Sequence, residues 1–283
     1  MSTAIEGFVD AGAAARASWD RIARGYDEHV TPTHLWLGNE GLRHAGVGPG
    51  TRFLDVAAGS GALSIPAARL GARVLASDLS SVMLDALQAR AQREGLDIEV
   101  RAMDGHALEL EDDTFDAAGS QFGVMLFPDM PRGIRELARV TKPGGRVLMT
   151  VYGAPERIEF FQLFVDAIRA AVPGFAGPPT DPPPLPFQLQ DPARLRRELT
   201  AAGLRDVRVE TITETLRFES GGQLWRWLVN SNPIVEQVLA DLGLTKRQTE
   251  TIRRALDDAV RERTRGGPFA RLTNPIHIGI GTK

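Results

Sequence analysis

Short apolar runs alternate with longer amphipathic segments between residues 52 and 151. Runs of this length and spacing predict strands that are separated by helices. Such an order predicts right-handed crossovers and a parallel sheet with helices on both faces. The predicted strands are 52–57, 73–77, 97–102, 115–120 and 146–151, and the predicted helices are 62–70, 80–94 and 131–140.

The region before residue 50 has helical spacing. Small and apolar residues recur every four positions, which predicts a helix over 11–29. Thr31-Pro32 predicts a break, because the residue before a proline disfavours the helical conformation. A short helix is then expected over 35–45, followed by a glycine–proline turn at 48–50.

After residue 152 the alternation is less regular. Eight of the 18 prolines fall between Pro173 and Pro192, so this stretch cannot form a regular helix or an interior strand. We expect it to form a stiff, extended cover. Apolar spacing on its two sides predicts helices 156–171 and 192–202, a strand at 204–218, helices within 222–264 and a last strand at 276–281.

The composition is that of a foldable globular chain, with 43% apolar residues and a net charge of −3. This charge, without any basic block, argues against a nucleic-acid partner. The absence of cysteine excludes thiolate nucleophiles and cysteine-ligated zinc. The apolar runs are shorter than the ~18–20 residues of a membrane span, and no signal-peptide pattern is seen, so a cytoplasmic location is expected.

In Asp55-Val56-Ala57-Ala58-Gly59-Ser60-Gly61 the first predicted strand ends in a glycine-rich loop that opens a helix. Glycines allow close approach of the backbone to a ligand, and the helix N-terminus offers free N–H groups. Asp78 follows the second predicted strand, where a carboxylate can accept both hydroxyls of a ribose. Asp104 follows the third, where it either meets an adenine amine or ends a turn before Gly105. The pattern predicts a nucleoside site.

Two nucleoside ligands fit this pattern. An NAD site expects a third glycine where this chain has Ser64, and the Asp55 carboxylate would repel a pyrophosphate. A ligand with a cationic amine favours Asp55 instead. S-adenosylmethionine (SAM) carries an amine, a ribose and a sulfonium, so the charge pattern favours SAM over NAD.

At this point the sequence resembles the class I SAM-dependent methyltransferases. The matching blocks are FLDVAAGSGALS (53–64), LASDLSSVML (75–84), AMDGHALELEDDTFDAAGSQFGVMLFPD (102–129) and LARVTKPGGRVLMT (137–150). The resemblance looks closest to the branch of ubiquinone/menaquinone-biosynthesis and polyketide-tailoring small-molecule methyltransferases. It implies an α/β fold with a Rossmann-like, doubly wound, seven-stranded sheet, a last antiparallel strand and added helical lid segments.

The resemblance also implies how SAM would be held. The glycine loop would bind the methionine part and the aspartate after the second strand the ribose, while the N-terminal helix closes over the cofactor. The implied cofactor residues are Trp19, Tyr26, Asp55, Ala57, Gly59, Ser60, Gly61, Asp78, Leu79, Met83, Asp104, Gly105, His106, Ser120 and Gln121. In one departure, Ala57 stands where the family usually has glycine, a change that we expect binding to survive.

Three parts of the chain are implied by the same resemblance. Residues 1–50 would be an N-terminal helical cap and residues 51–152 the SAM-binding core. Residues 153–283 would complete the sheet, with the proline-rich loop 173–192 and the helices of 222–264 forming a substrate lid.

Methyl transfer depends mainly on positioning in a pocket of low polarity, although a histidine can remove the proton of a phenol or enol. None of the five histidines has a metal-ligand spacing, so no metal site is expected. His29 and His34 are the candidate bases, because the N-terminal segment should border the active site. His277 is a further candidate, and any of the three can equally be a surface or structural histidine.

Aromatic residues gather in the two segments added after the core strands. They are Phe160, Phe161, Phe164, Trp225 and Trp227. Their positions fit either the plain core of these helices or an apolar lid over a bulky acceptor.

The sequence therefore predicts a SAM-dependent methyltransferase that acts at an oxygen or carbon of a hydrophobic small molecule, such as a quinone-like, polyketide or other natural-product ring. Gln121-Phe122-Gly123 differs from the Asn-Pro-Pro-Tyr type found in methyltransferases of nucleic acids and protein glutamines. Two alternatives stay open: an NAD-type oxidoreductase and a SAM-binding protein without methyl transfer. The expected partners are the small-molecule acceptor and, as one option, a second copy in a homodimer.

Overall fold

The computed structural model describes residues 2–179, 181–264 and 266–283, with side chains from residue 12 onward. Seven strands form one sheet in the order β3-β2-β1-β4-β5-β7-β6. The strands are β1 Arg52–Val56, β2 Arg73–Asp78, β3 Ile98–Ala102, β4 Phe115–Gln121, β5 Thr141–Tyr152, β6 Arg205–Phe218 and β7 Ala270–Thr282. Neighbouring strands from β3 to β5 are parallel, and β7 runs antiparallel to both β5 and β6. The predicted fold class is confirmed.

Helices cover both faces of the sheet. Helices α2, α3 and α4 pack on one face, where Leu42, Ile65 and Leu87 belong to one buried cluster. Helices α5 and α7 pack on the other face, through residues such as Ile134 and Leu195. The bounds of these helices are α2 Thr31–Ala45, α3 Ser64–Arg69, α4 Ser81–Glu94, α5 Met130–Val140 and α7 Pro192–Ala201.

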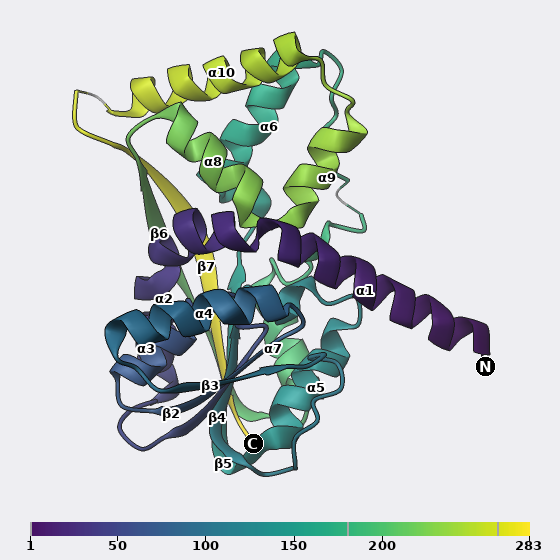
Figure 1. Ribbon diagram of the computed structural model, residues 1–283, viewed down its shortest axis with the longest axis vertical. Coiled ribbons are helices and arrows are strands. Elements are labelled where there is room, and N and C mark those ends of the chain that lie inside the picture. The colour runs from purple at the N-terminus through teal and green to yellow at the C-terminus, as the bar shows by residue number, and fades with distance from the viewer. Residues whose placement is uncertain (1, 180, 265) are drawn as a thin grey trace.

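A second group of helices lies beyond the end of the short strands. Figure 1 shows this group around the far ends of β6 and β7, with α1 passing between it and the rest of the sheet. Its core contains Trp227, Ile252 and Leu256 together with Leu216 and Leu272 from the two long strands. The helices of this group are α6 Glu159–Ala171, α8 Gly221–Ser231, α9 Pro233–Asp241 and α10 Lys246–Thr264, and the helix that passes beside it is α1 Ser2–Gly25.

The N-terminal region differs from its prediction. The break expected at Thr31-Pro32 is absent, because a π-helical turn, Tyr26–Val30, leads from α1 directly into α2. Pro32 falls in the first turn of α2, where its missing N–H would have had no intrahelical partner.

Two strands are longer than their apolar runs suggest. β5 begins at Thr141, five residues before the predicted start, and residues 142–145 form an irregularity between the pairs Phe115–Thr141 and Ala117–Arg146. β7 begins at Ala270, six residues before the predicted start, because it pairs with β6 along almost its whole length. Its first residues pack under the added helices.

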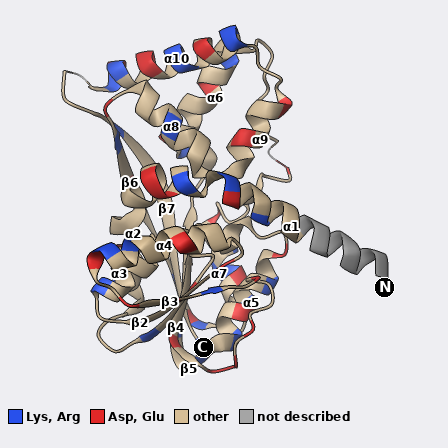
Figure 2. Cartoon of the chain, viewed as in Figure 1, with Lys and Arg blue, Asp and Glu red and all other residues tan. Residues whose placement is uncertain are grey.

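Charged side chains are mixed over the surface. Basic and acidic residues alternate along α10, as Figure 2 shows. No helix within the described residues is long and apolar enough to cross a membrane.

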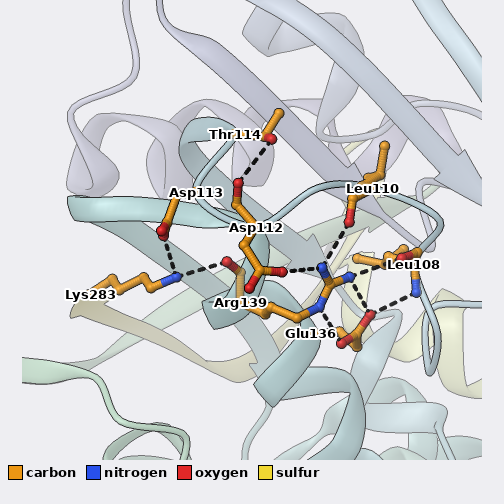
Figure 3. A network of polar contacts seen from close by, with 8 residues as sticks. All are labelled: Leu108, Leu110, Asp112, Asp113, Thr114, Glu136, Arg139 and Lys283. Atoms are coloured by element: carbon orange, nitrogen blue, oxygen red, sulfur yellow. Dashed lines mark hydrogen bonds and ion pairs between the residues drawn. The ribbon is translucent and has the colours of Figure 1, made fainter.

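A guanidinium clamp holds the loop between β3 and β4 (Figure 3). The Arg139 side chain donates hydrogen bonds to the carbonyls of Leu108 and Leu110 at 2.9 and 2.8 Å and to Asp112 at 2.6 Å. It also meets both carboxylate oxygens of Glu136, which in turn accepts the Leu108 N–H. Since the same loop carries residues 104–106, the clamp fixes one wall of the site described below.

Arg139→Ala is expected to lower the free energy of unfolding by about 2 kcal/mol, because it removes several charge-assisted hydrogen bonds to one loop. Urea denaturation followed by circular dichroism measures this. Arg169→Ala serves as the control, since that arginine makes an exposed ion pair with Asp166 within one helix. A loss below about 0.5 kcal/mol is expected there, and equal losses in both variants would contradict the clamp.

Candidate functional site

The glycine loop folds over the carboxyl end of β1. Ala57, Gly59 and Gly61 have φ values of 56°, 53° and 98°, a region that favours glycine. A Cβ at Gly61 would lie 2.9 Å from Leu87 Cγ. Ala57 therefore adopts a glycine-like conformation, and its methyl group takes the space that a Cβ at Gly123 would need, only 2.5 Å away.

Two aspartates lie behind and beside this loop. Asp78 accepts hydrogen bonds from the N–H groups of Gly59 and Ser80 at 2.8 and 2.9 Å, which ties the loop to β2. Asp55 is buried, and its Oδ2 accepts from the Ser64 hydroxyl at 2.6 Å. Its Oδ1 is buried without a hydrogen-bond partner among the described residues. A buried acceptor of this kind is suited to a ligand that donates.

Burial governs the electrostatics of this pair. It raises the pKa of Asp55 to about 7, against the lowering effect of the Ser64 hydrogen bond. It also raises the pKa of Asp78, although the backbone donors oppose the shift. The Tyr26 phenol is raised above its usual pKa by burial and by both carboxylates. A cation bound here would restore the ionised carboxylates.

A small cavity of about 220 Å³ opens in front of these groups. One end is formed by Asp104, Gly105 and His106, where His106 Nδ1 lies 2.8 Å from Asp104 Oδ1. The His106 ring packs on Phe127 with centroids 4.4 Å apart. A Cβ on Gly105 would come within 2.5 Å of the Phe127 ring, so a glycine is needed there.

The N-terminal helix covers the same cavity. Trp19 and Tyr26 both line it, and their rings meet edge to face at 6.0 Å. The Ser80 hydroxyl donates to Asp20, and Arg90 pairs with Asp27, so α4 holds α1 and the π-turn in place.

A second, large cavity of about 910 Å³ adjoins the first. Trp19, Tyr26, Phe122 and Leu126 line both cavities. The wall of the large cavity is mostly aromatic and aliphatic, from α6, α8 and α9, together with six prolines of the segment 173–192. Four of its rings form a continuous series, in which Phe122 stacks on Tyr152, Tyr152 meets Phe160, and Phe160 meets Trp227.

Most of the predicted cofactor residues converge on the small cavity. Those on its wall are Trp19, Tyr26, Asp55, Ala57, Gly59, Asp78, Leu79, Met83, Asp104, Gly105, His106 and Gln121. Ser60, Gly61 and Ser120 are not on the wall. Instead, Ser60 bonds Thr31 and Ser120 accepts the Val124 N–H, so both shape the loops from behind.

The three histidines proposed as bases have different surroundings. His34 lines the large cavity, whereas His29 and His277 line neither cavity. His29 lies 3.8 Å from Glu28 and is partly exposed. Both ring nitrogens of His277 have partners, Thr211 and the Gln190 carbonyl, so this histidine is held structurally.

Sequence reasoning did not assign several residues on the small cavity. The most consequential are Phe122, Leu126 and Phe127, which follow β4 in and beside the short 3₁₀ segment Val124–Leu126. Their signal was their place directly after a strand that ends at the site. The aromatic lid prediction fits Phe160, Phe161, Phe164 and Trp227, which line the large cavity, while Trp225 does not.

The sheet order and the pair of aspartates at the carboxyl ends of β1 and β2 define a nucleoside-cofactor-binding α/β protein. Comparison with known proteins identifies the cofactor. Residues 54–149 match a family model described as a methyltransferase domain. A demethylmenaquinone methyltransferase of Mycobacterium sp. (strain KMS) is 34% identical over 208 residues, which is 69% of this chain and 87% of that protein.

Two further comparisons bear on the fold and on the extent of the match. An uncharacterized protein of Mycobacterium tuberculosis is 48% identical over 103 residues, 36% of this chain, and the match spans only 38% of its length. The structure of phosphoethanolamine N-methyltransferase 2 of Haemonchus contortus, in complex with SAM, superposes with a TM-score of 0.52. That match has 19% identity and covers 87% of this chain and 52% of the other.

The chain belongs to the class I SAM-dependent methyltransferases. Its cofactor is SAM, and the product form is S-adenosylhomocysteine. This excludes the NAD-type alternative, in agreement with Ser64 at the third position of the glycine motif.

Proposed function

We propose that the protein transfers a methyl group from SAM to an oxygen or carbon atom of a bulky, apolar ring compound. The observation that carries this proposal is the meeting of the two cavities at Trp19, Tyr26, Phe122 and Leu126. One cavity has the polar groups that a nucleoside and an amino acid require, and the other is apolar. A reactive group at their junction would be shielded from water.

The residues of the small cavity fit SAM. Asp78 presents a carboxylate for the ribose hydroxyls, and Asp55 has a buried oxygen free to accept from the amine. Leu79 and Met83 offer apolar surface, and Asp104 lies at the end suited to the adenine. When bound, SAM supplies an electrophilic methyl group on a sulfonium, and the protein orients the reacting groups and excludes water from them.

The large cavity supports a ring compound as the acceptor. Its aromatic series from Phe122 to Trp227 favours a flat, apolar ligand. The name of the demethylmenaquinone methyltransferase relative points in the same direction, toward a quinone-like ring. The stretch of prolines on the wall closes this cavity with a segment that loses little conformational freedom.

We further propose that His34, rather than His29, removes a proton from the acceptor. His34 is on the wall of the large cavity and its ring packs 5.0 Å from the Phe122 ring, which borders both cavities. Burial lowers the pKa of His34 to about 4, so the ring is neutral near pH 7 and able to accept a proton.

A panel of acceptors tests the function. Purified protein is incubated with SAM and, separately, with 1-naphthol, a prenylated naphthoquinol and phosphoethanolamine, and S-adenosylhomocysteine release is measured by mass spectrometry. Methylation of a ring compound and not of phosphoethanolamine is expected. Turnover of the polar amine alone would overturn the proposed acceptor class. SAM binding without turnover of any tested acceptor would count against the proposal and favour the non-methylating alternative.

The affinity for SAM is expected to fall as the pH decreases below about 7. The ammonium of SAM pairs with ionised Asp55, whose pKa in the free protein is about 7. Binding at pH 6 must therefore displace a proton, which weakens it by about tenfold relative to the plateau above pH 8. Titration calorimetry between pH 6 and 8.5 measures the slope, and Asp55→Asn should bind weakly with little pH dependence. An unchanged affinity across this range in the wild type would show that Asp55 does not meet the amine.

A further inference from the structure

Glu214 is a buried carboxyl group that the proposed function has not used. It lies in β6, is fully buried, and accepts a hydrogen bond from Asn274 Nδ2 of β7 at 3.1 Å. Asn274 is itself fully buried, and the two residues are paired in the strand register. Glu214 Oε1 has no hydrogen-bond partner among the described residues. Burying such a group is costly, so its retention next to a cavity points to a use.

The free oxygen of Glu214 faces His34. His34 Nε2 lies 3.5 Å from Glu214 Oε1, within ion-pair range but without hydrogen-bond geometry. Such contacts are often long before substrate binds and shorten in the complex. His34 Nδ1 is left without a hydrogen-bond partner in the described part of the chain.

The His34 ring is confined on other sides as well. Phe122 and Trp227 pack against it at 5.0 and 6.0 Å, and both line the large cavity. Gln121 donates to the His34 carbonyl at 3.2 Å, which ties this turn of α2 to the end of β4. The imidazole therefore has a carboxyl group on one side and aromatic rings of the cavity wall on the other, and both ring nitrogens are buried, so an acceptor must displace one of these rings to reach Nδ1.

We propose that Glu214 is a positioning residue that orients His34 as the base for the acceptor, with Asn274 fixing the carboxylate. This inference rests on the proposed function and deepens it, because it specifies an acceptor with a weakly acidic hydroxyl. Ionised Glu214 would accept the Nε2–H of His34, which leaves the lone pair on Nδ1 for the acceptor proton.

The proposed methyl transfer is coupled to loss of the acceptor proton. The acceptor O–H bond breaks, its proton moves to His34 Nδ1, and the ring becomes an imidazolium beside the Glu214 carboxylate. The acceptor oxygen forms a bond to the methyl carbon while the methyl–sulfur bond breaks, and that electron pair stays on sulfur. The products are the methyl ether and S-adenosylhomocysteine, and the proton leaves His34 for solvent after release.

Charge in this region depends on few groups. Burial raises the pKa of Glu214 to about 8 and lowers that of His34 to about 4. Among the described residues, the neighbouring titratable groups are two phenols. Glu214 raises the pKa of Tyr152 in β5, and Tyr26 of the π-turn raises that same pKa. Both phenols have pKa values raised by burial and stay neutral. A protonated Glu214 would donate its hydrogen to Nε2 of His34, so the ring hydrogen would sit on Nδ1 and block it as a proton acceptor. The ability of His34 to act as the base is therefore expected to rise with pH through about 8.

Nuclear magnetic resonance of ¹⁵N-histidine-labelled protein with S-adenosylhomocysteine tests the pair without any acceptor. The His34 nitrogen shifts are followed with pH in the wild type and in Glu214→Gln, which keeps the size and the contact with Asn274. We expect the wild-type ring to adopt the Nε2–H tautomer as the pH rises through about 8, because ionised Glu214 accepts that hydrogen, whereas Glu214→Gln should show no such change over this range. Identical titrations in the two proteins would overturn the proposal.

Two acceptors distinguish a loss of base catalysis in Glu214→Gln from a general disruption of the active site. Glu214→Gln should lower kcat for 1-naphthol by about 100-fold, with KM and SAM affinity within threefold. For 2-hydroxy-1,4-naphthoquinone, whose hydroxyl is already ionised at neutral pH, kcat should change less than threefold. An equal loss for both acceptors would overturn the assigned role. If neither compound is methylated by the wild type, the proposed function fails, while the resonance comparison still decides the pairing.

The chain supplies a matched control for these measurements. Glu210 lies four residues earlier on the same strand, and its carboxylate is 3.6 Å from His44, which belongs to α2 as His34 does. Glu210 is 59% exposed and lines neither cavity. Glu210→Gln is expected to leave both the His34 titration and the two kcat values unchanged.

Discussion

Asp78→Ala is expected to weaken SAM binding by about 100-fold or more. The carboxylate of Asp78 lines the small cavity and is oriented by the N–H groups of Gly59 and Ser80. It can accept both ribose hydroxyls, and each hydrogen bond to a charged acceptor contributes about 1.5–3 kcal/mol. Losing two therefore removes about 3 kcal/mol or more, which corresponds to at least two orders of magnitude in Kd. Calorimetric titration of SAM measures the change.

Two controls show whether the loss of SAM affinity is specific to the Asp78 carboxylate. Asp104→Ala removes a carboxylate from the other end of the same cavity, but that side chain is 47% exposed. Its loss is expected to cost less than tenfold, since water competes for its hydrogen bonds. Thermal denaturation without SAM shows whether the loop from Gly59 to Ser80 stays folded in Asp78→Ala. An affinity within fivefold of wild type would show that the ribose is held elsewhere.

The inner parallel strands were predictable because they are buried on both faces. Segments such as 53–56 and 74–77 are buried and apolar except for Asp55 and Ser77, and the predicted ends of these strands agree with the structure to within one or two residues. The start of β7 was not predictable. Asn274 and Pro275 interrupt its apolar pattern, and the residues before them are buried only because the added helices pack on that end of the sheet.

The candidate site likewise contains residues that the sequence predicts and residues that it does not. Asp55 and Asp78 were predictable because each lies at the carboxyl end of a strand, and both strands end at the shared edge of the sheet, so local order fixes their position. The contact between His34 and Glu214 was not, since 180 residues separate the two. Along β6 the side chains of Glu210 and Glu214 both fit an alternating polar pattern, yet one is exposed and the other fully buried. What distinguishes Glu214 is contact with residues distant in the sequence, His34 of α2 and Asn274 of β7.

Leu126→Trp is expected to reduce kcat by at least 100-fold while SAM affinity changes less than fivefold. Leu126 is half-buried in the 3₁₀ segment after β4, at the junction that the two cavities share. An indole there would fill the passage between the cofactor and the acceptor. In-line methyl transfer tolerates little displacement, and an error of about 1 Å in position can cost about 100-fold in rate. Steady-state release of S-adenosylhomocysteine and calorimetry give the two values.

Size, rather than the loss of leucine, should cause this effect. Leu126→Met keeps nearly the same volume and is expected to retain activity within threefold. Leu70→Trp adds the same indole at an exposed position that lines neither cavity and should leave both kcat and affinity unchanged. If Leu126→Trp instead loses SAM affinity in proportion to kcat, the side chain belongs to the cofactor pocket alone. Full activity in this variant would mean that the acceptor reaches the methyl group by a route other than the junction of the two cavities.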